Sequence, residues 1–332
     1  MLISSPAPYG VSQRDTNGKG NIVISGRTGT NIGTHSIEAR FNGGAWQTVA
    51  TAIPEKTLFT GTLTNQSQGQ GTFEIRYTDS LETTTVAYVG VGDVFLIAGQ
   101  SNAAGAADNQ QIYAHPTLKA GLFGNDYVWH ELYDKTDDTN GQIDTVSLDI
   151  GLGYSMWPNL ASFFLTNQAV PCAFIPCALG GVAITQWMAT VTHTNRATLY
   201  GSAAWRGGTN AVGPIKGILW WQGESDMINT NSTVFYYSNL TLLASNFYAD
   251  LGVKMVVPKL QNCTALTSLQ QSNINAAITN AWALNSSVIV AGPDMSGINT
   301  DDAYHLRTTA KLKQAAALWW AAMEIAYTNN RW

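Results

Sequence analysis

After Asp93 the chain alternates short apolar runs with amphipathic stretches, and this alternation limits the possible folds more than any other feature. The helical stretches cover residues 154–168, 232–251, 266–284 and 306–327. The apolar runs are too short for helices and apolar enough for strands buried on both faces; they are VFLIA (94–98), AFIPCA (173–178), KGILWW (216–221), VKMVV (253–257) and VIVA (288–291). Repeated βαβ units predict a three-layer α/β/α fold around a parallel sheet of flavodoxin-like strand order.

The first part of the chain has a different period. Short alternating or β-branched runs fill residues 21–91, among them NIVISG, THSIEARF and GTFEIRYT, with Gly, Asn, Thr and Pro turns between them. This pattern predicts a small β-sandwich. We therefore expect an accessory domain at 1–91 and a second domain at 92–332. Within the latter, residues 106–151 are rich in Asp, Asn and Gly and are predicted to form a loop that walls an active site.

Composition excludes several classes of partner and cofactor. Charged residues make up 12% of the chain and the net charge is −5, with no basic stripe that could neutralise nucleic-acid phosphates. No apolar run reaches the length of a membrane span. The three cysteines form no C-x-x-C pair, so no metal site is expected. The start of the chain lacks the features of a signal peptide, as a mature secreted protein also would, and the Asn/Thr/Gly-rich, weakly charged composition suits an extracellular or virion-associated setting.

The turn Gly99-Gln100-Ser101-Asn102 follows the first buried strand directly. Its small residues allow a sharp bend, which would leave the Ser101 hydroxyl at the carboxyl end of that strand. Ligands of open α/β sheets bind at this edge, so Ser101 is a candidate nucleophile. The alternative is a serine that only caps the following helix.

Two later stretches fall at the same edge of the predicted sheet. Gly180-Gly181 follows the second buried strand, where a glycine turn lets a backbone N–H approach an oxyanion closely, although it is also compatible with a simple tight turn. Gln222 and Glu224 follow the third buried strand; the Gln222 amide has two hydrogen-bond donors to offer to the crevice. Glu224 is either part of the chemistry or a buried carboxylate that ties loops together.

A carboxylate–histidine pair precedes the last helix. Asp302 lies three residues before His305, a spacing that lets its carboxylate accept the imidazole Nδ1–H and leaves Nε2 free as a base. Asp301 and Glu224 are the other candidates for the acid that orients this histidine. The i to i+3 spacing favours Asp302.

Four blocks, GQSNAAG, CALGGVAITQW, WWQGESD and DAYH, resemble those of the SGNH hydrolase superfamily in its carbohydrate acetylesterase and sialate O-acetylesterase branch. The resemblance implies that Ser101 is the nucleophile, His305 the base and Asp302 its orienting acid. It further implies an oxyanion hole made of the Ser101 N–H, a Gly180 or Gly181 amide and Gln222. Gln100, Asn102 and Glu224 then have supporting roles.

The resemblance predicts a serine esterase that removes O-acetyl groups from a polysaccharide or a sialic acid, with no metal or cofactor. Trp187, Trp221 and Tyr304 are candidates for stacking on sugar rings, with core packing as their alternative. A general short-chain acyl esterase is a second hypothesis. A glycan-binding or virion-associated protein without activity is a third, and the intact Ser101, Asp302 and His305 argue against it.

Overall fold

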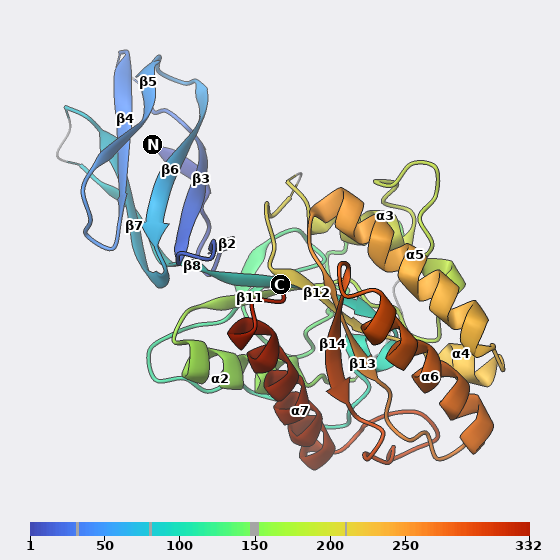
Figure 1. Cartoon of the computed structure of the whole chain (residues 1–332). Coiled ribbons are helices and arrows are strands. Elements are labelled where there is room, and N and C mark those ends of the chain that lie inside the picture. Colours follow the sequence, from blue (N-terminus) through green and yellow to red (C-terminus); the bar gives the residue numbers. More distant parts are fainter. Residues whose placement is uncertain (31–32, 80–81, 147–152, 210) are drawn as a thin grey trace.

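The computed structural model describes residues 1–30, 33–79, 82–146, 153–209 and 211–332. A large sheet runs through the C-terminal part of the molecule (Figure 1), and its central neighbours pair in parallel in the order β11-β8-β12-β13-β14. These strands are β8 (Thr84–Gly99), β11 (Cys172–Pro176), β12 (Gly217–Trp221), β13 (Met255–Lys259) and β14 (Ile289–Asp294). The predicted mixed α/β fold around a large central sheet is confirmed.

Helices cover this sheet on both faces. Successive residues of a strand point to opposite faces, and in β12 Trp221 meets Trp319 of one helix layer while Trp220 meets Trp187 of the other. The longer helices are α2 (Trp157–Gln168), α3 (Leu199–Arg206), α5 (Thr233–Leu251), α6 (Ser268–Leu284) and α7 (Thr309–Thr328), and the short ones are α1 (Ser101–Ala104), η1 (Ile184–Trp187) and α4 (Glu224–Ile228). In the described part of the chain, no helix is both long and apolar enough to cross a membrane.

The segment 106–151, predicted to be a loop, contains two short strands. β9 (Gly121–Phe123) pairs in parallel with β11 and extends the sheet, and β10 (Trp129–Glu131) pairs antiparallel with β9. Three residues are too few to produce a readable period in the sequence. Residues 147–151 of that prediction lie outside the described ranges.

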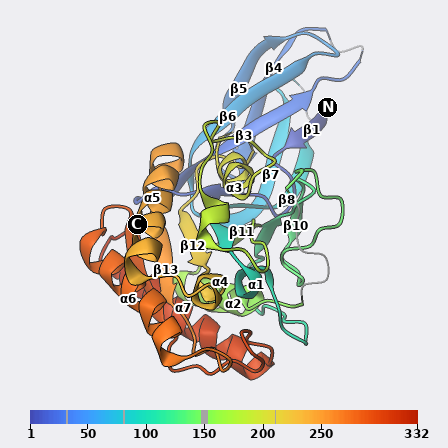
Figure 2. The same cartoon turned by 90° about the vertical axis from the view of Figure 1, so that its right-hand side faces the viewer.

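The N-terminal strands form two sheets that enclose a second core. One sheet contains β1 (Leu2–Ser5), β3 (Lys19–Arg27) and β6 (Leu58–Ser67); the other strands are β2 (Val11–Gln13), β4 (His35–Phe41), β5 (Gln47–Ile53) and β7 (Gly69–Tyr77), which continue into β8. Apolar side chains from both sides fill the space between them, for example Ile24 and Leu63 against Ile37 and Phe73. The sequence analysis did not predict β1, β2 and β6. The view in Figure 2 shows these strands at one end of the molecule and α6 and α7 at the other.

Strand β8 is shared by the two cores. Its first half pairs with β7 and β2, and its second half pairs with β11 and β12, so the predicted boundary between residues 91 and 92 falls inside one strand. The fully buried Asp93 lies just beyond that boundary. Its carboxylate accepts hydrogen bonds from Gln13 and Arg14 on the N-terminal side and from the Tyr327 hydroxyl of α7.

Candidate active site

Ser101 lies where β8 turns into α1. Gly99 makes this turn with φ +139°, and a side chain there would clash with the backbone of β12, because a Cβ would lie 2.0 Å from the Trp221 carbonyl oxygen. Ser101 is the first residue of α1 and its side chain is almost buried. Because Gly99 pairs with Trp221 in the sheet register, the ends of β8 and β12 lie side by side.

Three side chains form a hydrogen-bonded series at this edge. The Ser101 Oγ lies 2.9 Å from His305 Nε2, and His305 Nδ1 lies 3.1 Å from Asp302 Oδ2. A carboxylate only accepts, so Nδ1 carries a proton and Nε2 of the neutral ring accepts from the hydroxyl. The backbone N–H groups of Tyr304 and His305 donate to Asp302 Oδ1 at 2.8 and 2.7 Å, which closes the turn that the i to i+3 spacing predicts.

These contacts keep Asp302 ionised. Partial burial acts to raise the pKa of Asp302, but the backbone donors of Tyr304 and His305 and the histidine side chain outweigh it and lower the pKa to about 2. Arg307 adds a donor at 3.2 Å to Oδ2 and is itself held by Asp108.

We expect the lowered pKa of Asp302 to be visible in acid denaturation. An unfolded aspartate titrates near about 3.9, so the unfolded chain takes up the proton first; the stabilisation is complete above that pH and is lost as the pH falls through about 2. Between pH 4 and 2 the melting temperature of Asp302→Asn should fall less steeply than that of the wild type. The control in calorimetric scans is Glu324→Gln, at an exposed carboxylate of α7. Parallel curves for Asp302→Asn and the wild type would contradict the assignment.

A cavity of about 450 Å³ opens in front of Ser101 and His305. The Gly180-Gly181 turn forms one wall; Gly181 has φ +72° and its Cα faces open space. The turn is tied to the end of β8, because the Leu179 N–H donates to the Gly99 carbonyl. The N–H of Ser101 lies in a first helical turn, where no intrahelical acceptor exists. The structure thus brings the Ser101 N–H and the two-glycine turn to one cavity.

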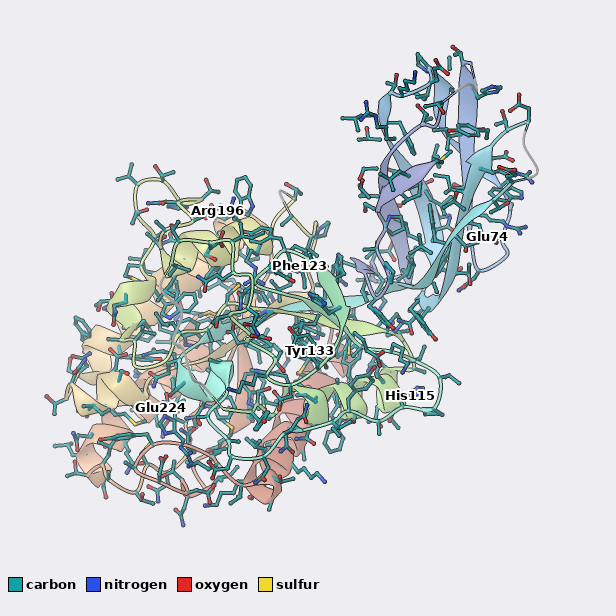
Figure 3. All side chains as sticks on the ribbon, turned by 180° about the vertical axis from the view of Figure 1, so that it is seen from behind. Glu74, His115, Phe123, Tyr133, Arg196 and Glu224 are labelled. Atoms are coloured by element: carbon teal, nitrogen blue, oxygen red, sulfur yellow. The ribbon has the colours of Figure 1, made fainter. Side chains whose placement is uncertain are left out.

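Glu224 lies behind this cavity and is fully buried next to α1 (Figure 3). Its Oε1 accepts from Asn102 Nδ2 and Gln261 Nε2, both at 2.7 Å, and burial raises its pKa despite these donors. The same Asn102 amide donates to the Tyr304 carbonyl, and Asn102 Oδ1 accepts from the Leu306 N–H. Glu224 and Asn102 therefore fix the backbone on both sides of His305, whereas the carboxylate that contacts the imidazole is that of Asp302.

Residues 91–324 match the family described as carbohydrate esterase, sialic acid-specific acetylesterase. The chain belongs to this family. It is 26% identical over 184 residues to the "probable carbohydrate esterase" of Arabidopsis thaliana, an alignment that covers 48% of this chain and 64% of that protein, so the chain spans less than two thirds of this relative.

Two solved structures share the fold of this chain. A carbohydrate acetylesterase from Xanthomonas citri is 17% identical, with a TM-score of 0.61, over 99% of this chain and 75% of its own. The crystal structure of the Arabidopsis thaliana protein is 22% identical, with a TM-score of 0.51, over 70% of this chain and 98% of its own.

In this family member Gln222 does not point into the cavity, contrary to the prediction. Its side chain is fully buried, and Nε2 donates to Asp226 Oδ2 at 2.6 Å, to the Val182 carbonyl at 3.0 Å and to Gln100 Oε1 at 3.2 Å. Both N–H groups are thus engaged within the protein, and none is left for an oxyanion. Gln100 Oε1 also faces the N–H groups of Gly223 and Ser225, which fixes the turn after β12.

Gln222→Ala is therefore expected to destabilise the fold more than it slows any reaction. Losing the amide removes one of the donors of Asp226 and one of the donors of Gln100 and leaves a cavity, so the free energy of unfolding should fall by about 2–4 kcal/mol. Urea denaturation measures this loss, and kcat on a small acetyl ester should change by less than about tenfold, against the 10²–10³ typical of an oxyanion donor. A loss of kcat in that larger range with unchanged stability would instead support the predicted role of Gln222 as an oxyanion donor.

For Trp187 and Trp221 the structure contradicts sugar stacking and shows the alternative, core packing. Trp187 and Trp221 are fully buried and pack against Trp220 and Trp319. The physical reason is that both faces of β12 are covered, so neither ring reaches solvent. Tyr304 is half-buried and lines the cavity, as a substrate contact would.

The sequence analysis missed three contributors to the site. Arg307 donates to Asp302, Asp108 holds Arg307, and Gln261 supports Glu224. Gln261 follows β13 just as Gln222 follows β12, so the same rule about polar residues after buried strands would have identified it. Asp108 carries no local signal, because its partner is 199 residues away in the chain.

Proposed function

We propose that the chain is a serine esterase that removes O-acetyl groups from a carbohydrate through an acyl-serine intermediate. The observation that carries this proposal is the series Asp302–His305–Ser101, hydrogen-bonded in that order at the wall of a cavity. Such an arrangement activates a serine hydroxyl by placing a base on it and orienting that base. Membership of a carbohydrate esterase family supports the same reaction.

In the first step Ser101 Oγ attacks the acetyl carbonyl carbon while His305 Nε2 takes its proton. The tetrahedral intermediate collapses as the bond to the sugar oxygen breaks, and His305 returns the proton to that oxygen. In the second step His305 takes a proton from water, the resulting hydroxide attacks the acyl-serine, and acetate leaves as Ser101 regains its proton. Asp302 stays ionised throughout and stabilises the imidazolium. The reaction requires no cofactor.

Backbone groups supply the proposed oxyanion hole. Ser101, Gly180 and Gly181 line the cavity, and N–H groups of such residues are preorganised donors that can stabilise the charge that develops in the transition state. With the Gln222 amide engaged elsewhere, we assign this role to them alone. Gln100, Asn102 and Glu224 position the turns that carry the reacting groups.

The proposal also covers the domain organisation and the location of the enzyme. We assign the strand order β11-β8-β12-β13-β14 to a flavodoxin-like sheet and the N-terminal strands to a β-sandwich at 1–91 that is accessory to the esterase domain at 92–332. The low share of charged residues, 12%, supports an extracellular location, either secreted or virion-associated.

A substrate panel tests the proposal. Acetate release should be measured from 4-nitrophenyl acetate, chemically acetylated xylose and mannose, their oligosaccharides, and an O-acetylated sialic acid. Turnover of acetylated sugars supports the proposal, and the preferred substrate identifies the class of carbohydrate. Turnover of 4-nitrophenyl acetate alone would identify a general short-chain esterase, and glycan binding without turnover a non-catalytic protein.

A further inference from the structure

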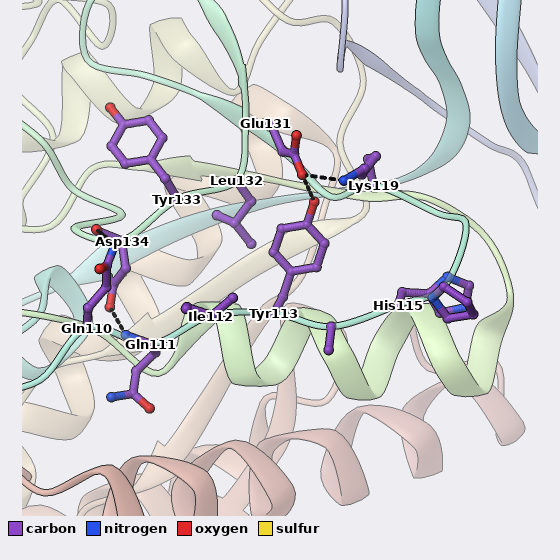
Figure 4. A pocket seen from close by; sticks show the side chains of 12 residues that line it. Gln110, Gln111, Ile112, Tyr113, His115, Lys119, Glu131, Leu132, Tyr133 and Asp134 are labelled. Carbon is purple, nitrogen blue, oxygen red and sulfur yellow. Dashed lines mark hydrogen bonds and ion pairs between the residues drawn. The ribbon is translucent and has the colours of Figure 1, made fainter.

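A second cavity, of about 610 Å³, lies in the C-terminal part of the molecule (Figure 4). Its walls are the segment 110–116, Lys119 and the segment 131–134, which lie in the long connection between β8 and α2. None of these residues takes part in the proposed reaction. The cavity combines a charged polar unit with exposed apolar side chains.

The polar unit is built around Glu131. Its Oε1 accepts from the Tyr113 hydroxyl at 2.5 Å and from Lys119 Nζ at 2.9 Å (Figure 4). Partial burial opposes ionisation, but these donors lower the pKa of Glu131, and the carboxylate raises the pKa of Lys119. Both side chains are about one third exposed. An accessible carboxylate beside an accessible ammonium group matches neighbouring sugar hydroxyls, which donate to the first and accept from the second.

The apolar part of the wall is open to solvent. Ile112 is 78% exposed and Tyr133 is 37% exposed, and Figure 4 shows the rings of Tyr133 and Tyr113 on either side of Leu132. A tyrosine with an accessible ring presents an apolar face together with a polar tip. A sugar ring needs this combination, because it has apolar C–H faces and a polar edge. Ligand sites typically combine such surfaces with a few convergent polar groups.

The cavity lies next to the one in front of Ser101. Arg307 lines the active-site cavity and its Nε donates to Asp108 at 3.0 Å. Gln110, two residues further along, begins the wall of the second cavity. In the view of Figure 3, Tyr133 lies between Glu224, behind the active site, and His115, at the far end of the second cavity. The walls of the two cavities are therefore linked through Arg307, Asp108 and the two residues that follow it, a span of less than about 10 Å that a chain of several sugar units exceeds.

We propose that this second cavity binds an unacetylated unit of the neutral glycan whose acetylated unit lies at Ser101, an inference that rests on the proposed function. The charges favour a neutral chain. Lys119 is already paired with Glu131, and the described residues that line the wall include no other lysine or arginine. The carboxylate of an acidic sugar would meet like charge.

Direct binding tests this assignment without depending on turnover. Unacetylated xylohexaose, mannohexaose, cellohexaose and hexagalacturonate are titrated into the full chain by calorimetry. We expect one of the neutral hexasaccharides to bind, and Tyr133→Ala and Glu131→Gln each to raise its Kd at least tenfold. Tyr133→Trp should retain binding because it keeps an aromatic face. The matched control is Tyr248→Ala, at a tyrosine of α5 that is 44% exposed and lines neither cavity.

Kinetics separates this inference from the proposed function. Tyr133→Ala should lower kcat/KM at least tenfold for an acetylated hexasaccharide and leave hydrolysis of 4-nitrophenyl acetate unchanged. The inference is overturned if no neutral hexasaccharide binds, if Tyr133→Ala binds it as the wild type does, or if hexagalacturonate binds more tightly than every neutral chain. Binding that depends on Tyr133 in a protein without any esterase activity would refute the proposed function while leaving a glycan site at this cavity.

Discussion

Ser101→Ala is expected to lower kcat for acetate release by about 10⁶-fold, as removal of a catalytic serine does in hydrolases of this type. The Ser101 hydroxyl contacts His305 Nε2, and among the described residues no other nucleophile is held at that base. Stability should change little: one hydrogen bond is worth about 1 kcal/mol, or a shift in Tm of about 2–4 °C in a chain of this size.

The measurement pairs steady-state kinetics with mass spectrometry of the acid-quenched enzyme. Wild type should carry an acetyl group on the peptide that contains Ser101, and the variant should carry none. Ser245→Ala, at a half-buried serine of α5 that bonds only its own helix, serves as the control. An acetyl adduct on a different residue, or a variant with a tenth of the original activity, would refute the nucleophile assignment.

Asp302→Asn should produce the second largest loss, about 10⁴-fold in kcat. An asparagine keeps its oxygen toward the backbone N–H groups of Tyr304 and His305 and turns its NH₂ group toward Nδ1. That contact favours the tautomer with a proton on Nε2, which cannot accept the proton of Ser101. The loss should appear in kcat, and Tm at neutral pH should fall only by the part of the stability that the ionised carboxylate contributes.

Replacements of the two other candidate carboxylates test whether Asp302 is the acid that orients His305. Glu224→Gln should cost stability at least as clearly as rate, since Glu224 holds Asn102 and Gln261 rather than the imidazole. Asp301→Asn should mainly lower Tm, because Asp301 accepts from the Arg307 and Thr308 N–H groups at the start of α7. If Glu224→Gln showed the larger loss in kcat with an unchanged Tm, Glu224 would be the orienting acid.

The parts of the site that sequence could predict are those governed by local geometry. The turn from Asp302 to His305 needs only the spacing of two residues, and the position of Ser101 needs only a buried strand that ends in glycine. The orientation of Gln222 could not be predicted, because it depends on Val182 and Gln100, which come from other turns. Trp221 was misassigned for a similar reason: its burial depends on Trp319 of α7, 98 positions further along the sequence.

The same distinction holds for the fold. Long elements with a clear period, such as α5 and the buried strands, lie close to their predicted ranges. β9 and β10 have three residues each, and their pairing is set by β11 rather than by their own composition. The elements that could not be predicted from the sequence are therefore those that are stabilised by partners distant in the chain.

The shared strand β8 has a mechanical consequence. Both halves of β8 are held by hydrogen bonds, the first half to β7 and the second half to β11. Bending the strand at the junction would break some of these hydrogen bonds and separate the Asp93 carboxylate from Arg14 and Tyr327. A tension applied at the N-terminal strands would reach the turn at Ser101 along a single backbone. A molecule that binds those strands would therefore fix the direction in which the cavity in front of Ser101 opens relative to itself.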